Sequence, residues 1–86
     1  MDKENANRRL LKSYQDKLSI QIKTMKRKAN KDTIMELSRL RYIVSKLENN
    51  KNINVEQLED ESIRYANEVI SAGNKLASIL GITPLD

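Results

Sequence analysis

The chain has 86 residues, of which 16 are Lys or Arg and 12 are Asp or Glu, for a net charge of +4 at pH 7. It contains no Cys and no His, which excludes disulfide bonds, thiolate or imidazole metal ligands, and catalysis by a Cys nucleophile or a His base. A chain of this length buries only about 60–65% of its unfolded surface. We therefore expect one domain with a marginal core, stabilised by self-association.

The charges are segregated along the chain. Residues 1–31 carry ten Lys or Arg against three Asp or Glu, a net charge of +7. Residues 32–50 are balanced at three against three, and residues 51–86 carry three against six, a net charge of −3. This distribution indicates an anionic partner for the N-terminal third.

The first predicted helix covers about residues 5–29. Apolar side chains recur there at spacings of three and four, which places them on one stripe of a helix: Leu11, Tyr14, Leu18, Ile22, Met25 and Ala29. Cations occupy the opposite side, with Ile20 as an apolar exception among them.

The second predicted helix covers about residues 33–49, with Asp32 expected to cap its first turn. Its main apolar seam consists of Ile34, Leu37, Leu40, Val44 and Leu47. Met35 and Tyr42 form a smaller patch on another side, so this helix is expected to contact more than one neighbour.

The third predicted helix covers about residues 55–80. Asn54 and Gln57 have the spacing of a capping box, and Ile53 and Leu58 that of a hydrophobic staple. Gly81 suits the left-handed residue that ends a helix, and Thr83-Pro84 prevents its continuation. The apolar arc of this helix is wide, and four small residues on it would let another backbone approach closely: Ser62, Ala66, Gly73 and Ala77.

These elements predict an all-α fold in which residues 1–86 form a single helical domain. Three amphipathic helices with short connections can form a small bundle, or a helical hairpin that pairs with other copies.

The sequence offers little for catalysis. It has no Gly-rich phosphate loop, and the carboxylates clustered at the start of the third helix are explained by the helix dipole. We expect a protein that is not an enzyme and has no metal or cofactor. No segment reaches the length of a membrane span and no leader is recognisable, so we expect a cytoplasmic protein without a membrane partner.

The cations of the N-terminal third are the candidate nucleic-acid contacts, because Lys and Arg that neutralise phosphates release counterions. They suit double-stranded DNA, although a solvated face that carries no function has the same composition. The predicted contacts are Arg8, Arg9, Lys12, Lys23, Lys26, Arg27, Lys28 and Lys31.

A second set of residues is predicted to form an oligomer or partner interface. They lie on the second and third predicted helices, whose apolar surfaces are wider than one neighbouring helix can cover. These residues are Met35, Tyr42, Tyr65, Val69, Ala72, Leu76, Ile79 and Leu80.

The C-terminal sequence KLASILGITPLD, residues 75–86, follows ESIRYANEVISAGN, residues 61–74. Together they resemble the C-terminal part of the small terminase subunits of tailed bacteriophages, in which a helix rich in small and aliphatic residues runs into a Leu-Gly-[Leu/Ile]-Thr-Pro stop. The resemblance implies a non-enzymatic, oligomeric helical protein that recognises viral DNA for packaging and recruits the large subunit.

A different function stays open on the residues alone. A small phage-type interaction module that binds and modulates a host protein would also be helical and lack catalytic groups. Exposure of Met35 and Tyr42 in a stable monomer would favour this alternative.

Overall fold

The computed structural model describes residues 3–50 and 52–82, and within them it has the all-α fold predicted from the sequence. Three helices follow one another: α1 (Lys3–Arg27), α2 (Lys31–Asn49) and α3 (Val55–Leu80). The third helix has the predicted bounds, and α2 begins about two residues earlier than predicted. The first helix both begins and ends about two residues earlier, so Ala29, predicted on its apolar stripe, lies exposed in the connection. No helix within the described ranges is both long enough and apolar enough to cross a membrane.

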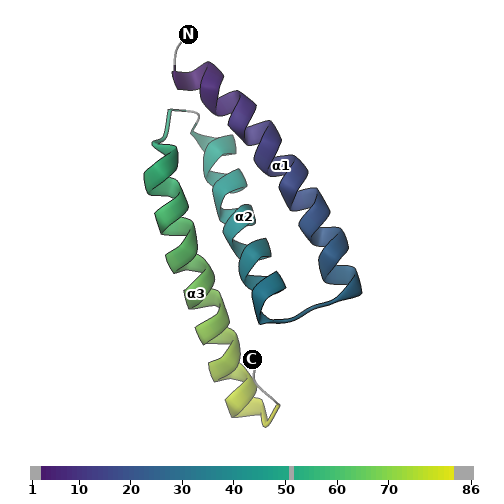
Figure 1. The fold of residues 1–86 in the computed structure, drawn as a ribbon. Helices are drawn as coiled ribbons and strands as arrows, with labels where there is room; N and C mark the ends of the chain where they lie inside the picture. The colour runs from purple at the N-terminus through teal and green to yellow at the C-terminus, as the bar shows by residue number, and fades with distance from the viewer. Residues whose placement is uncertain (1–2, 51, 83–86) are drawn as a thin grey trace.

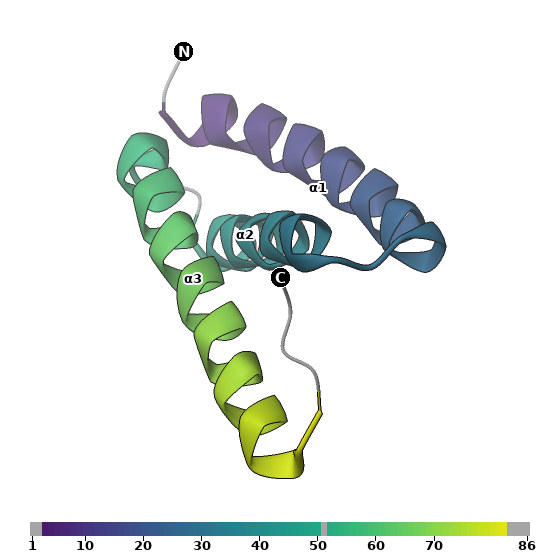
Figure 2. The same cartoon turned by 60° about the horizontal axis from the view of Figure 1, so that its bottom comes forward.

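The central helix α2 lies between α1 and α3 and packs against both (Figure 1). Viewed nearly along α2, the other two helices diverge from each other on its two sides (Figure 2). They are linked directly near the α2–α3 connection, where the Asn7 side-chain amide donates to the Ile53 carbonyl oxygen over 2.9 Å. The Tyr14 hydroxyl of α1 also donates to the Glu59 carboxylate of α3.

The core sits at this end of the molecule, where all three helices meet. Its buried side chains come from α1, α2 and the first turns of α3: Tyr14, Leu40, Ile43, Val44, Leu47 and Leu58. Ile43 was not assigned to the predicted seam of α2, yet it is fully buried. It lies on the side of α2 between the seam and the Met35–Tyr42 patch, so the two predicted patches are parts of one broad contact surface.

The start of α2 corrects one prediction. Asn30, rather than Asp32, is the N-cap residue, with an extended backbone at φ −141° and ψ −179°. Its side-chain oxygen accepts from the Thr33 amide over 2.9 Å, and the Thr33 hydroxyl accepts from the Asn30 amide over 2.9 Å. This reciprocal capping box starts the helix two residues earlier and leaves Asp32 in the first turn, where its charge suits the helix dipole.

Both ends of α3 follow the predicted chemistry, with one difference at the start. The Asn54 side chain accepts from the Gln57 amide as predicted, but the Gln57 side chain donates to Glu61 over 3.2 Å and does not complete the box. At the other end Gly81 has φ +73°. The Ile82 amide donates to the Ala77 carbonyl over 2.8 Å and the Gly81 amide to the Ser78 carbonyl over 3.3 Å, the pattern of a Schellman motif. Thr83 and Pro84 lie outside the described residues.

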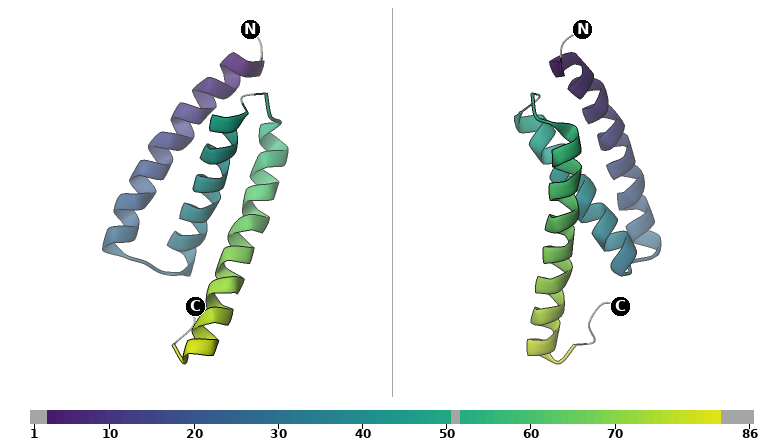
Figure 3. Two further views of the ribbon diagram at one scale, coloured as in Figure 1. Left: turned by 180° about the vertical axis from the view of Figure 1, so that it is seen from behind. Right: turned by 60° about the vertical axis from the view of Figure 1, so that its left-hand side comes forward.

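The last turns of α3 extend past α1 and α2 (Figures 1 and 3). Ile70 is the last buried residue of this helix, and residues 71–82 are exposed or half-buried. Gly73, expected to let a backbone approach, has nothing within 4 Å of where a Cβ would be. The radius of gyration is 14.8 Å, against about 12 Å for a compact domain of this length. The molecule is therefore an open arrangement of helices with a small core at one end.

Candidate functional surfaces

The predicted DNA contacts on α1 lie on the side of the helix that faces away from α2. This cationic face consists of Arg8, Arg9, Lys12, Lys23, Lys26 and Arg27, all of which are exposed. The face is possible because the residues that contact the core, such as Tyr14, fall on the opposite stripe of the same helix.

The cationic face is divided into two patches. Asp16 and the exposed Ile20 lie between Lys12 and Lys23, which are separated by about 16 Å of helix at 1.5 Å per residue. Lys28 and Lys31 are also exposed but lie off α1, in the connection and at the first residue of α2. The connection is anchored by the Thr33 hydroxyl, which donates to the Lys28 carbonyl oxygen over 3.1 Å. Lys28 directly follows the second patch, which consists of Lys23, Lys26 and Arg27.

The residues predicted as an oligomer or partner interface divide into two groups. Met35, Tyr42 and Val69 are half-buried within the molecule, and Tyr65 beside Tyr42 is 40% exposed. Tyr42 contacts Tyr65 across α2 and α3, with ring centroids 5.0 Å apart. Met35 and Tyr42 are therefore partly exposed, and α3 contacts Tyr42 through Tyr65.

The second group forms an exposed apolar surface at the end of α3. Its large side chains are Leu76, Ile79, Leu80 and, in addition to the predicted residues, Ile82, each more than half exposed. Ala72 is exposed on the same helix. We call Leu76, Ile79, Leu80 and Ile82 the apolar overhang. Residues 69–82 contain a single charged residue, Lys75, so this surface is both apolar and nearly uncharged.

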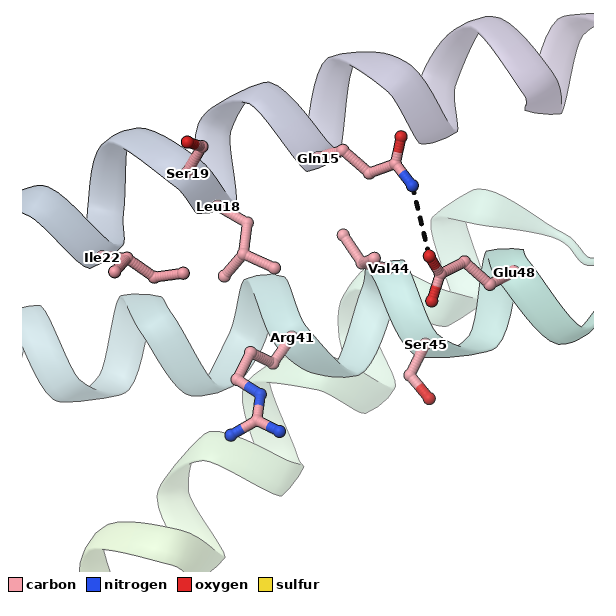
Figure 4. Close-up of a pocket in the computed structure, with 8 residues that line it drawn as sticks. All are labelled: Gln15, Leu18, Ser19, Ile22, Arg41, Val44, Ser45 and Glu48. Carbon is pink, nitrogen blue, oxygen red and sulfur yellow. Dashed lines mark hydrogen bonds between the residues drawn. The ribbon is translucent and has the colours of Figure 1, made fainter.

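A groove lies between α1 and α2 (Figure 4). It has a volume of about 500 Å³. Leu18, Ile22 and Val44 form an apolar floor, and the Gln15 side chain donates to Glu48 across it over 3.2 Å. Arg41 and Ser45 line the opposite wall, and the Arg41 guanidinium extends away from α1.

A smaller hollow lies on the other side of Arg41, between α2 and α3. Arg41, Tyr42, Ser45, Lys46 and Tyr65 line this tyrosine hollow. The Lys46 ammonium lies 5.4 Å from the centroid of the Tyr42 ring, a cation–π contact. Arg41 and Ser45 were not selected from the sequence, because their role depends on how α1 and α3 pack on either side of α2.

A third hollow, on the far side of the tyrosine pair, has the opposite charge. Its lining includes Glu61 and Glu68 against Arg64. The Tyr42 hydroxyl donates to Glu61 over 3.1 Å, and burial followed by this hydrogen bond raises the pKa of Tyr42. The tyrosine pair therefore separates a cationic hollow from an acidic one.

Two further charged contacts are structural. Burial and the hydrogen bond to Glu59 raise the pKa of Tyr14 to about 12, so this phenol is neutral at physiological pH. Arg39 donates to Glu36 over 2.6 Å on one turn of α2, and this hydrogen bond raises the pKa of Arg39. In residues 3–50 and 52–82 no group of three or more acidic residues is placed to hold a metal ion.

Comparison of the chain with protein-family models, with curated proteins and with solved structures found no match.

Proposed function

We propose that the chain is a non-enzymatic, self-associating protein that binds double-stranded DNA through α1. The observation that carries this proposal is the segregation of six exposed cations on one face of α1, opposite the residues that form the core. From Arg8 to Arg27 the face spans about 28 Å at 1.5 Å per residue. Each of the two cationic patches along this length can neutralise phosphates of a duplex.

The more specific part of the proposal is that the chain acts as a small terminase subunit of a phage. It rests on the resemblance of residues 61–86 to that family. In this role the protein recognises the packaging start on viral DNA, and its oligomer recruits the large subunit. Co-sedimentation with the large terminase subunit encoded by the same genome tests this role, and absence of any complex at micromolar concentrations contradicts it.

The DNA-binding part is tested by removing charge from the second cationic patch. In the first variant Lys23, Lys26 and Arg27 are changed to Gln. Because each phosphate contact contributes about 0.9 to the slope of log K against log salt, we expect this slope to fall by up to about three, with a loss of affinity for duplex DNA. Fluorescence anisotropy with a labelled duplex over a series of salt concentrations measures both quantities.

A charge-matched variant is the control for this measurement. Changing Lys17, Arg64 and Lys75 to Gln removes the same charge from exposed positions outside the cationic face. We expect this control to keep most of the salt dependence. Equal losses in the two variants would mean that only the net charge matters, and would remove the support for a binding face on α1.

A further inference from the structure

The exposed side of α2 carries two hollows that share Arg41 and Ser45. The apolar groove opens toward α1, and the tyrosine hollow opens toward α3. Arg41 stands on the ridge between them with an exposed side chain. Its guanidinium extends from the groove wall away from α1, as Figure 4 shows.

The tyrosine hollow combines an aromatic surface with positive charge. Tyr65 is 40% exposed beside Tyr42. The charged residues that line the hollow are Arg41 and Lys46, which are both cations. This combination suits a nucleotide, because a base stacks on aromatic rings and a phosphate pairs with Arg or Lys. The hollow beyond the tyrosine pair is lined by Glu61 and Glu68 against the single cation Arg64. Its net negative charge is less favourable for a phosphate than the Arg41 side.

The apolar groove suits the neighbouring base of a strand. Its floor of Leu18, Ile22 and Val44 is apolar, and its walls offer the Ser19 and Ser45 hydroxyls. The Gln15 amide is already bonded to Glu48, the one acidic residue of this lining. Ser19 lies one helical turn before Lys23, so the groove borders the cationic face of α1. A backbone that crosses Arg41 toward α1 would therefore continue to meet cations.

We propose that this side of α2 binds single-stranded DNA, with one base stacked on Tyr65, the next in the α1–α2 groove, and the phosphate between them on Arg41. The inference deepens the proposed DNA binding, because the strand shares the cationic face of α1 with the duplex. Single-strand binding at this site differs from the proposed duplex binding because it requires unpaired bases. A base that is paired in a duplex cannot enter either hollow.

The first test compares three ligands on the unaltered protein: a short oligothymidine, an abasic strand with the same number of phosphates, and a duplex. Because stacking on one aromatic residue accounts for roughly a 5- to 100-fold change in affinity, we expect oligothymidine to bind at least five times more tightly than the abasic strand. Equal affinity for these two strands overturns the proposal. Binding of the duplex alone also overturns it but leaves the proposed function intact, whereas binding of oligothymidine alone supports it and contradicts duplex recognition.

The second test uses substitutions at the two central residues. We expect Tyr65→Leu to weaken oligothymidine binding at least five-fold and Tyr65→Phe, which keeps the ring, to preserve it. Arg41→Gln is compared with Lys75→Gln, which removes the same charge from the end of α3, and should lower the affinity for oligothymidine more. Circular dichroism melting identifies any variant that fails to fold. If Tyr65→Leu binds oligothymidine as tightly as Tyr65→Phe does, the stacking site is wrong, and if Arg41→Gln matches Lys75→Gln, the phosphate contact is wrong.

Discussion

The buried polar residues make hydrogen bonds both between and within elements of the fold. Asn7 donates to the Ile53 carbonyl, and the fully buried Ser62 donates to the Glu59 carbonyl over 2.6 Å. Within the described ranges, every buried side-chain nitrogen or oxygen has a hydrogen-bond partner. Sequence periodicity placed Tyr14 in the apolar stripe but gave no reason to select Asn7, because its partner is 46 residues away in a loop.

Because of Tyr14, the free energy of unfolding should decrease as the pH rises into the alkaline range. Its pKa of about 12 lies above the ordinary value of 10.0, so the folded state keeps the proton over a range in which the unfolded state loses it. The contribution of this group is complete below pH 10 and is lost as the pH rises toward 12. We expect the melting temperature to fall more steeply over this interval in the natural protein than in Tyr14→Phe, as measured by circular dichroism.

The comparison with Tyr14→Phe removes the effect of lysine titration, which is common to both proteins. Below pH 9 the variant should be less stable by about 1 kcal/mol, because the hydrogen bond to the half-buried Glu59 is lost. Parallel pH profiles for the two proteins would show that Tyr14 keeps an ordinary pKa in the fold.

At the scale of the helices, local sequence predicted the helix boundaries to within two residues and the cationic face of α1. The cationic face follows from a period of 3.6 residues alone, and Asn54 and Gly81 were recognisable from their neighbours. The cap of α2 was mistaken because Asn30 and Asp32 are equally good N-cap residues. Thr33 decides between them through its side-chain bond to the Asn30 amide. The groove and the hollows require the packing of two helices, which periodicity within one helix does not specify.

The two ends of α3 should respond differently to substitution. Asn54→Ala removes a cap beside the core and should destabilise the whole protein by about 1 kcal/mol. Gly81→Ala forces a Cβ into the left-handed region at a local cost of about 1–2 kcal/mol. Because the overhang lacks buried contacts, this cost should appear as fraying of the last turns and not as a lower melting temperature.

Native-state hydrogen exchange of the Gly81 and Ile82 amides, together with thermal melting, separates these two responses. We expect faster exchange of both amides in Gly81→Ala with an unchanged melting temperature. A drop in melting temperature as large as that of Asn54→Ala would show that the end of α3 is coupled to the core.

At the scale of the whole molecule, the small core and the exposed overhang favour association of copies. Eight apolar side chains in the described ranges are buried, whereas Leu76, Ile79, Leu80 and Ile82 remain exposed at the end of α3. If the overhang associates, binding stabilises the folded state by mass action, so the melting temperature should rise with protein concentration. Sedimentation velocity at several concentrations measures the association directly.

The double substitution Leu76→Ser and Ile79→Ser tests the surface itself. We expect it to yield a monomer whose melting temperature no longer depends on concentration. Ile20→Ser is the matched control, because Ile20 is also an exposed apolar residue, at 64% exposure, but lies on the cationic face. A natural protein that stays monomeric at millimolar concentration, or a control that dissociates equally, would contradict an interface at the overhang.

The position of α2 between its two sequence neighbours also bears on how the chain folds. Each extensive helix–helix contact joins elements that are consecutive in sequence, α1 with α2 and α2 with α3. Such a topology has low contact order, so little loop entropy is lost before packing begins, and helical proteins of this kind fold in microseconds to milliseconds. The two helical hairpins share α2, so whichever hairpin forms first provides the surface on which the remaining helix docks. A chain with this topology can therefore fold through contacts between consecutive helices, before its N-terminal and C-terminal segments come into contact.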